Sequence, residues 1–130
     1  MVMLNPSKAD EATDDPTIRR CIGFARSWGF GSLAVGNLFA YRTTYPDALC
    51  ASSDPVGFEN DRWLRLLHEE SPLTIAAWGN HGCLLGRSIA YRRTMSGLHI
   101  LDLTRLGEPR HPLYVDSDVV PQPWSAPLDR

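Results

Sequence analysis

Four short apolar runs recur along this chain, separated by stretches whose apolar positions follow a helical spacing. The runs cover residues 2–4, 33–38, 73–78 and 98–103, and they are rich in branched apolar side chains. Strands that are apolar at successive positions are typical of a parallel sheet buried on both faces. The pattern therefore predicts four strands of one such sheet.

Three stretches between or beside these runs have the periodicity of amphipathic helices. In the first, Asp15 followed by Pro16 is a typical helix start, because Asp caps the free N–H groups and proline suits the first turn. Strand and helix in alternation predict the α/β class, with a three-layer, four-stranded, mainly parallel sheet flanked by helices. The predicted helices are residues 16–28, 57–70 and 81–94.

The chain has 130 residues, which suits a single domain with one core. Residues 1–115 carry all the periodic segments and are expected to form the α/β body. Residues 116–130 contain several prolines and no periodicity, so we expect an extended C-terminal arm. Trp124 is the side chain through which this arm is expected to pack over the body.

Composition and charge exclude several classes of function. A net charge of −2 argues against a protein that coats nucleic acid non-specifically. No apolar run is long enough to span a membrane, no secretory leader is evident, and three widely spaced cysteines suggest reduced thiols, so a cytoplasmic protein is expected. The Walker phosphate loop and the dinucleotide-binding glycine motif are missing, which argues against nucleoside-triphosphate hydrolysis and Rossmann redox chemistry, and the cysteines have no metal-ligand spacing.

Polar side chains follow each predicted strand, where ligands bind in open parallel sheets. Amides can donate and accept hydrogen bonds, which suits the edge of a planar heterocycle, and arginine can hold phosphate. A histidine can donate to a developing oxyanion, and an aspartate can orient a water molecule. The set predicts a polar, planar ligand that can carry phosphate. Its members are Asn5, Ser7, Asp14, Asn37, Arg42, Asn80, Arg105, Arg110 and His111.

Each candidate also has a plainer structural interpretation. Asn5 before a proline is a common turn former, and Asp15 as a helix cap leaves Asp14 the freer carboxylate. His111 between Arg110 and Pro112 has the context of an ordinary loop residue. Asn37 lies inside an apolar run, so its amide must find partners if it is buried.

Five ordered motifs resemble the bacterial family named domain of unknown function 1643. They are "MLNPSKADEATDDPTIRRCIGFARSWGF", "VGNLFAYRTTYP", "DPVGFENDRWL", "AAWGNHG" and "LGEPRHPLY", and they run from residue 1 to about residue 114. Members of that family usually carry further residues before the first motif. The first strand here begins at residue 1, so a longer natural start is one expectation, and the short strand would leave an edge that a second copy can fill.

The order of motifs is also similar, more distantly, to the uracil-DNA glycosylase superfamily, a parallel sheet of four strands between helices. That resemblance implies that Asn5 positions water, that Asn37 reads the edge of a base, and that His111 stabilises the departing base. Asp14 is the carboxylate expected to assist Asn5, and the implied mechanism needs neither a metal nor an organic cofactor. Two departures matter: Leu113 stands where that superfamily has serine, and no base-stacking aromatic residue follows the first motif.

Three functions compete on this basis. The first is a hydrolase of N-glycosidic bonds acting on a nucleobase in a nucleotide or a nucleic acid. The second is a non-catalytic module that binds a nucleotide or base. The third is a protein-interaction domain, in which Asn5, Asn37 and His111 do not converge. The sequence is compatible with a monomer or a homodimer.

Overall fold

The computed structural model describes residues 1–6 and 15–125, and within them the strands form one five-stranded sheet. Its order is β2-β1-β3-β4-β5. β1, β2, β3 and β4 pair in parallel, and β5 is antiparallel to β4. The strands are β1 (Val2–Met3), β2 (Gly36–Asn37), β3 (Ile75–Ala76), β4 (His99–Ile100) and β5 (Gln122–Pro123).

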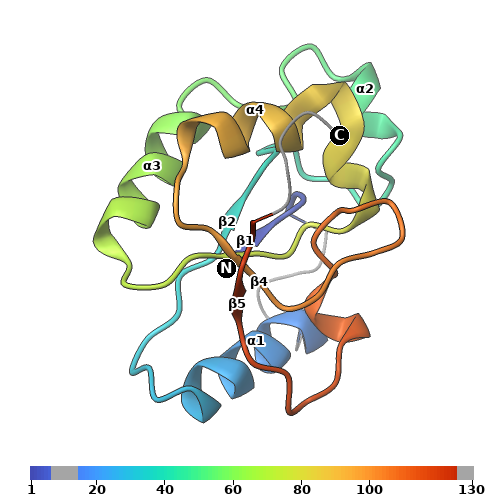
Figure 1. The fold of residues 1–130 in the computed structure, drawn as a ribbon. Coiled ribbons are helices and arrows are strands. Elements are labelled where there is room, and N and C mark those ends of the chain that lie inside the picture. The colour runs from blue at the N-terminus through green and yellow to red at the C-terminus, as the bar shows by residue number, and fades with distance from the viewer. Residues whose placement is uncertain (7–14, 126–130) are drawn as a thin grey trace.

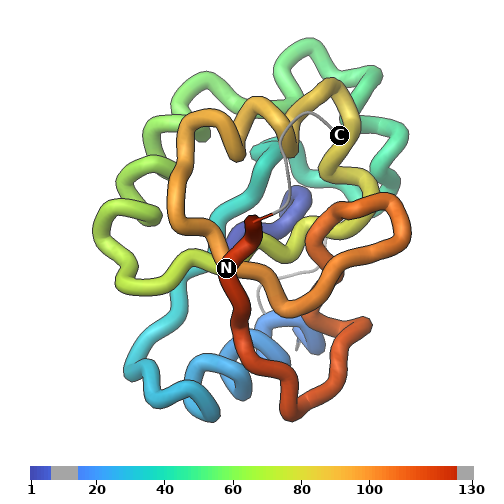
Figure 2. Tube along the Cα trace, viewed as in Figure 1, coloured from blue at the N-terminus to red at the C-terminus, as the bar shows by residue number. Residues whose placement is uncertain are grey.

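Each of the four predicted runs contains one of the parallel strands, but the prediction of four strands was wrong. The fifth strand comes from the proline-rich arm, where the backbone N–H of Trp124 donates to the carbonyl of Leu98 at 2.9 Å. Proline has no N–H, so β5 is confined to the edge of the sheet. The ring of Trp124 lies 5.7 Å from that of Trp78, which confirms that the arm packs on the body. Figure 2 shows this segment rising along the sheet from the side of α1.

Helices cover both faces of the sheet, so the predicted three layers are confirmed. α1 lies on one face, and α2, α3 and α4 lie on the other (Figure 1). Asp15 caps α1 as predicted, because its side chain accepts from the N–H of Thr17 at 2.8 Å. None of the described helices is both long and apolar enough to cross a membrane. The helices are α1 (Pro16–Ser27), α2 (Ala48–Ala51), α3 (Asn60–Glu70) and α4 (Arg87–Thr94), with 3-10 turns η1 (Asn80–Gly86) and η2 (Pro112–Tyr114).

The prediction of one helix over residues 81–94 was wrong, because the chain turns in its middle. Leu85 and Gly86 have φ angles of 56° and 65°, in the left-handed region that an α-helix cannot contain. The first half is therefore the 3-10 turn η1, and only Arg87–Thr94 is α-helical. After the turn, the buried Arg87 side chain donates to Leu38 O at 2.7 Å and to Asp61 Oδ1 at 2.6 Å.

The core is divided by the sheet into two clusters, as strands buried on both faces require. Val2, Ala76 and Ile100 belong to the cluster that contains residues of α3 and α4. Met3 and Ile75, their neighbours along the strands, belong to the cluster that contains Phe24 of α1. Successive side chains of a strand point to opposite faces, which produces this division.

Candidate functional site

A cavity of about 690 Å³ opens beyond the carboxyl ends of β1 and β3, where the sequence predicts a ligand site. Its volume is within the usual range for small-molecule pockets. Segments far apart in the chain form its walls. They are the end of β1, the start of η1, and residues 104–105 and 110–114. The described lining residues are Met3, Leu4, Asn5, Trp78, Gly79, Asn80, His81, Thr104, Arg105, Arg110, His111 and Tyr114.

The structure brings only some of the predicted residues together. Asn5, Asn80, Arg105, Arg110 and His111 all line this cavity. Neither Asn37 nor Arg42 is among its described lining residues. Ser7 and Asp14 lie outside the described part of the chain.

The side chain of Asn5 ties the end of β1 to the loop that follows β2. Its Nδ2 group lies 3.1 Å from Pro6 O, 3.2 Å from Tyr41 O and 2.8 Å from Thr43 O. An amide has two N–H donors, and these three carbonyls account for both of them. Asn5 therefore has the structural role of a turn residue, and a ligand in the cavity can meet only its acceptor, Oδ1.

The ring of His111 is held in one orientation by η2. Its Nδ1 accepts a hydrogen bond from the N–H of Leu113 at 3.1 Å, so the neutral ring carries its proton on Nε2. Burial lowers the pKa of His111 from 6.5, and the charge of Asp15 opposes that shift. The His111 ring also lies 5.6 Å from that of Tyr114. At neutral pH the residue is therefore an uncharged hydrogen-bond donor.

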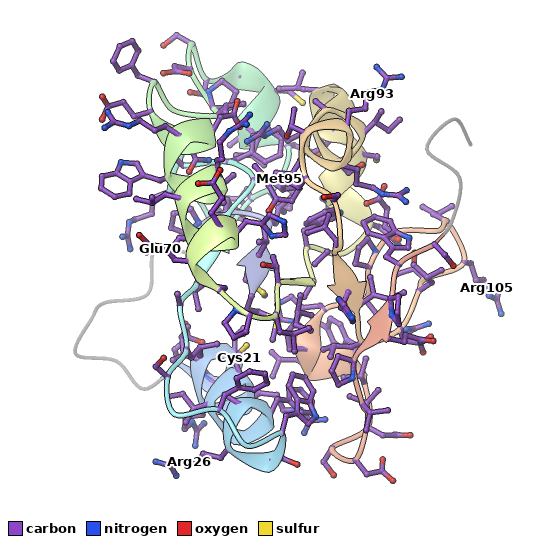
Figure 3. All side chains as sticks on the ribbon, turned by 60° about the vertical axis from the view of Figure 1, so that its left-hand side comes forward. Cys21, Arg26, Glu70, Arg93, Met95 and Arg105 are labelled. Carbon is purple, nitrogen blue, oxygen red and sulfur yellow. The ribbon has the colours of Figure 1, made fainter. Side chains whose placement is uncertain are left out.

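A tight loop after β4 supplies the two arginines of the cavity. Leu103 pairs with Pro109 in an antiparallel bridge, and the N–H of Thr104 donates to Glu108 O at 2.8 Å. Arg105 is exposed and extends outward from this loop (Figure 3). The Arg110 guanidinium is only partly engaged, since Nε lies 3.7 Å from Asp102 Oδ2 and Nη2 lies 3.5 Å from Leu103 O.

The Glu108 carboxylate anchors that loop to the core, a role that was not predicted from the sequence. Its Oε2 accepts from Trp78 Nε1 at 2.5 Å, and its Oε1 accepts from Ser88 Oγ at 2.9 Å. Trp78 and Ser88 are each only 2% exposed, so the carboxylate satisfies two buried donors. The one signal in the sequence is an acidic residue within the motif "LGEPRHPLY".

Two glycines explain why the chain can turn into the cavity directly after β3. Gly79 has a φ angle of 76°, which favours glycine, and its N–H donates to Pro109 O at 2.8 Å. A Cβ atom on Gly82 would lie 2.0 Å from Cδ1 of the Trp78 ring, which is impossible without rearrangement. The motif "AAWGNHG" therefore turns back over its own tryptophan, with the backbone of Gly82 packed against the Trp78 indole. This turn places Asn80 and His81 at the cavity.

Asn37 lies on β2, the strand beyond β1 as seen from the cavity. Its backbone carbonyl accepts from Asn60 Nδ2 at 2.8 Å, which links β2 to α3. The same Asn60 amide lies 3.2 Å from Leu38 O. These contacts show the end of β2 engaged with α3.

The cavity is rich in hydrogen-bond donors. Two arginines and two histidines are among its described lining residues, and these residues include no aspartate or glutamate. In the part of the chain that the structure describes, no group of three or more His, Cys, Asp or Glu side chains could hold a metal ion. The arrangement therefore suits an organic ligand with many acceptor oxygens, such as a phosphate ester.

Comparison with known proteins identifies the family of the chain. A family model described as "Protein of unknown function (DUF1643)" matches residues 1–113. No curated protein and no solved structure matches the chain. The resemblance to uracil-DNA glycosylases is not supported by these comparisons, and a glycosylase-like fold stays a prediction. Because the family model covers most of the chain, the protein belongs to the DUF1643 family.

Proposed function

We propose that the cavity beyond β1 and β3 binds a nucleotide, either free or as a unit of a nucleic acid. The observation that carries this proposal is the joint presence of Asn80, Arg105, Arg110 and His111 around one cavity of about 690 Å³. Such a set of donors matches the oxygens of a phosphate and the acceptors of a base. Two of the three residues expected to converge at a ligand site, Asn5 and His111, share this cavity, whereas Asn37 is not among its described lining residues. The shared cavity supports a ligand site over a domain used only for protein interactions.

Charge and aromatic surface suggest how the nucleotide would lie. Arg105 and Arg110 come from the same loop, so the phosphate belongs beside them. Tyr114 lines the cavity with 72% of its surface exposed, and its ring offers a flat face to a base. Asn80 and His111 can then donate to atoms on the edge of the base.

Binding can be measured by isothermal titration calorimetry with uridine, cytidine, inosine and adenosine monophosphates, and with inorganic phosphate. We expect a nucleotide to bind more tightly than inorganic phosphate. Arg110→Gln should weaken nucleotide binding by about tenfold or more, the effect of removing one charged hydrogen bond. Arg65→Gln, an exposed position on α3 outside the cavity, is the matched control and should bind as the wild type does.

The proposal fails if folded protein binds none of these nucleotides at millimolar concentration. It also fails if Arg110→Gln and Arg65→Gln bind equally well. Circular dichroism of each variant confirms that the proteins compared are folded.

A second candidate is hydrolysis of the N-glycosidic bond, and the orientation of His111 favours it. A neutral ring with its proton on Nε2 can donate to a base oxygen that gains negative charge as the bond breaks. The uncharged state agrees with burial, which lowers the pKa of His111. In this mechanism Asn5 contributes Oδ1 to orient water, as the glycosylase resemblance implies, and Asp14, which lies outside the described residues, is the carboxylate expected to assist it. Asn37, to which the resemblance assigns the reading of the base, is not among the described lining residues of the cavity.

Release of free base distinguishes hydrolysis from binding. The protein is incubated with nucleotides and with single- and double-stranded DNA that contains uracil or hypoxanthine, and the products are separated by chromatography. If the protein is a hydrolase, it should release free base, and His111→Asn should abolish that release. The variant should still fold, because the side-chain oxygen of asparagine can cap η2 as His111 Nδ1 does. Binding of a nucleotide without any base release would leave the protein a binding module.

A further inference from the structure

The hydroxyl group of Thr104 lies between the side chain of Asn80 and the backbone of Glu108. Thr104 Oγ1 is 2.5 Å from Asn80 Oδ1, and the N–H of Glu108 donates to Oγ1 at 3.3 Å. The loop that carries Thr104 is itself held by the hydrogen bond from Thr104 N to Glu108 O at 2.8 Å. Asn80 and Thr104 both line the cavity.

These contacts determine which end of the Asn80 amide faces Thr104. A separation of 2.5 Å is typical of a short O–H···O hydrogen bond and too short for N–H···O. The Thr104 hydroxyl oxygen already accepts a hydrogen bond from the Glu108 N–H. If the hydroxyl hydrogen is donated to Asn80 Oδ1, both the acceptor and the donor of this hydroxyl have a partner. The reverse orientation of the amide would leave the Thr104 hydrogen without this acceptor. The Nδ2 group of Asn80 is therefore directed away from Thr104.

We infer that Thr104 is a positioning residue that fixes Asn80 as a hydrogen-bond donor, so that the site prefers ligands with a carbonyl oxygen over ligands with an amino group at the contacted position. This inference rests on the proposed nucleotide binding. An amino group placed against the Nδ2 group of Asn80 would set two donors face to face and leave both unpaired. A carbonyl oxygen at the same point completes a hydrogen bond.

Matched nucleotides test this preference, because uridine and cytidine monophosphates differ in one carbonyl oxygen against one amino group on the base. Inosine and adenosine monophosphates form a second such pair. Asn80 is exposed, so water can pair its amide when the ligand does not, and the preference is worth the net value of one hydrogen bond. We expect the wild type to bind the carbonyl member about fivefold to tenfold more tightly. Calorimetry gives the two dissociation constants and hence their ratio, which a general loss of stability would not change.

Variants of Thr104 and Asn80 separate positioning from simple contact. Thr104→Val keeps the shape but loses the hydroxyl, so we expect the ratio to fall to within about threefold of unity. Thr104→Ser keeps the hydroxyl and should retain the wild-type ratio. Asn80→Asp presents an acceptor in place of the donor and should reverse the preference toward cytidine and adenosine monophosphates.

Three outcomes would overturn the inference. These are equal binding of carbonyl and amino nucleotides by the wild type, an unchanged ratio in Thr104→Val, or an unchanged preference in Asn80→Asp. Each of them leaves nucleotide binding itself intact, so the proposed function would survive. Failure of every nucleotide to bind the folded wild type would instead overturn the proposed function and this inference with it.

Discussion

Removal of the Glu108 carboxylate should destabilise the fold strongly, although the residue lies in a loop. In Glu108→Ala the indole N–H of Trp78 and the hydroxyl of Ser88 both lose their acceptor while they remain buried. A hydrogen bond to a charged group contributes about 1.5–3 kcal/mol, so the two together are worth about 3–6 kcal/mol. Glu108 is only partly buried and water can replace part of this, so we expect a loss near the lower end, about 3 kcal/mol.

Guanidinium chloride unfolding, followed by tryptophan fluorescence, measures this loss as a lower midpoint with an unchanged slope. In a thermal melt the same loss should lower the midpoint by about 10 °C. Glu108→Gln should cost only about 1 kcal/mol, since its side-chain oxygen can accept from Trp78 and its amide can donate to Ser88. The control is Glu69→Ala, at an exposed position on α3. If Glu108→Ala unfolds within about 1 kcal/mol of this control, the reasoning about buried donors is refuted.

Four further predictions concern the core and the cavity. Tyr91→Phe should leave the free energy of unfolding unchanged or raise it by up to about 1 kcal/mol, because no described residue pairs with the buried Tyr91 hydroxyl. An ultraviolet titration of the wild type should show one tyrosine ionising late, since burial raises the pKa of Tyr91 to about 12. Gly82→Ala should cost about 2 kcal/mol or more in denaturant unfolding, since its methyl group would overlap the Trp78 ring. His111 has a lowered pKa, so its stabilising contribution is present above pH 6.5 and is lost as the pH falls below that value. His111→Asn should remove this part of the pH dependence in unfolding curves between pH 7 and pH 5.

The sequence predicted which residues would lie close together where the prediction depended on the ends of adjacent strands. Asn5 follows β1 and Asn80 follows β3, which are hydrogen-bonded neighbours, and both residues line the cavity. Asn37 is the last residue of β2 and is in register with Met3 of β1, and it is not among the described lining residues. A residue that follows a parallel strand can be placed at the carboxyl edge of the sheet from the sequence. The order of the strands and the paths of the connecting loops then decide which of these residues line the same pocket.

The Glu108 and Thr104 contacts could not be read from the sequence. Glu108 meets Trp78 and Ser88, which are 30 and 20 residues away along the chain. Thr104 meets Asn80 across 24 residues. No periodicity or local motif records such pairs, because they arise only when β3, α4 and the loop after β4 come together.

Local patterns in the amino-acid sequence determined the α/β class, the four parallel strands and the start of α1. A strand that is apolar at successive positions has to be covered on both faces, which favours a parallel sheet between helices. Asp15 followed by Pro16 favours a helix start through local capping alone. The tertiary structure alone decided the other features. The arm became β5 because the edge of β4 was open to it, and the chain turned at Leu85 and Gly86 rather than continuing as a helix. The shape of the cavity and its hydrogen-bond donors likewise depend on contacts between residues far apart in the chain. Such contacts form only in the folded protein, so no local segment of the sequence predicts them.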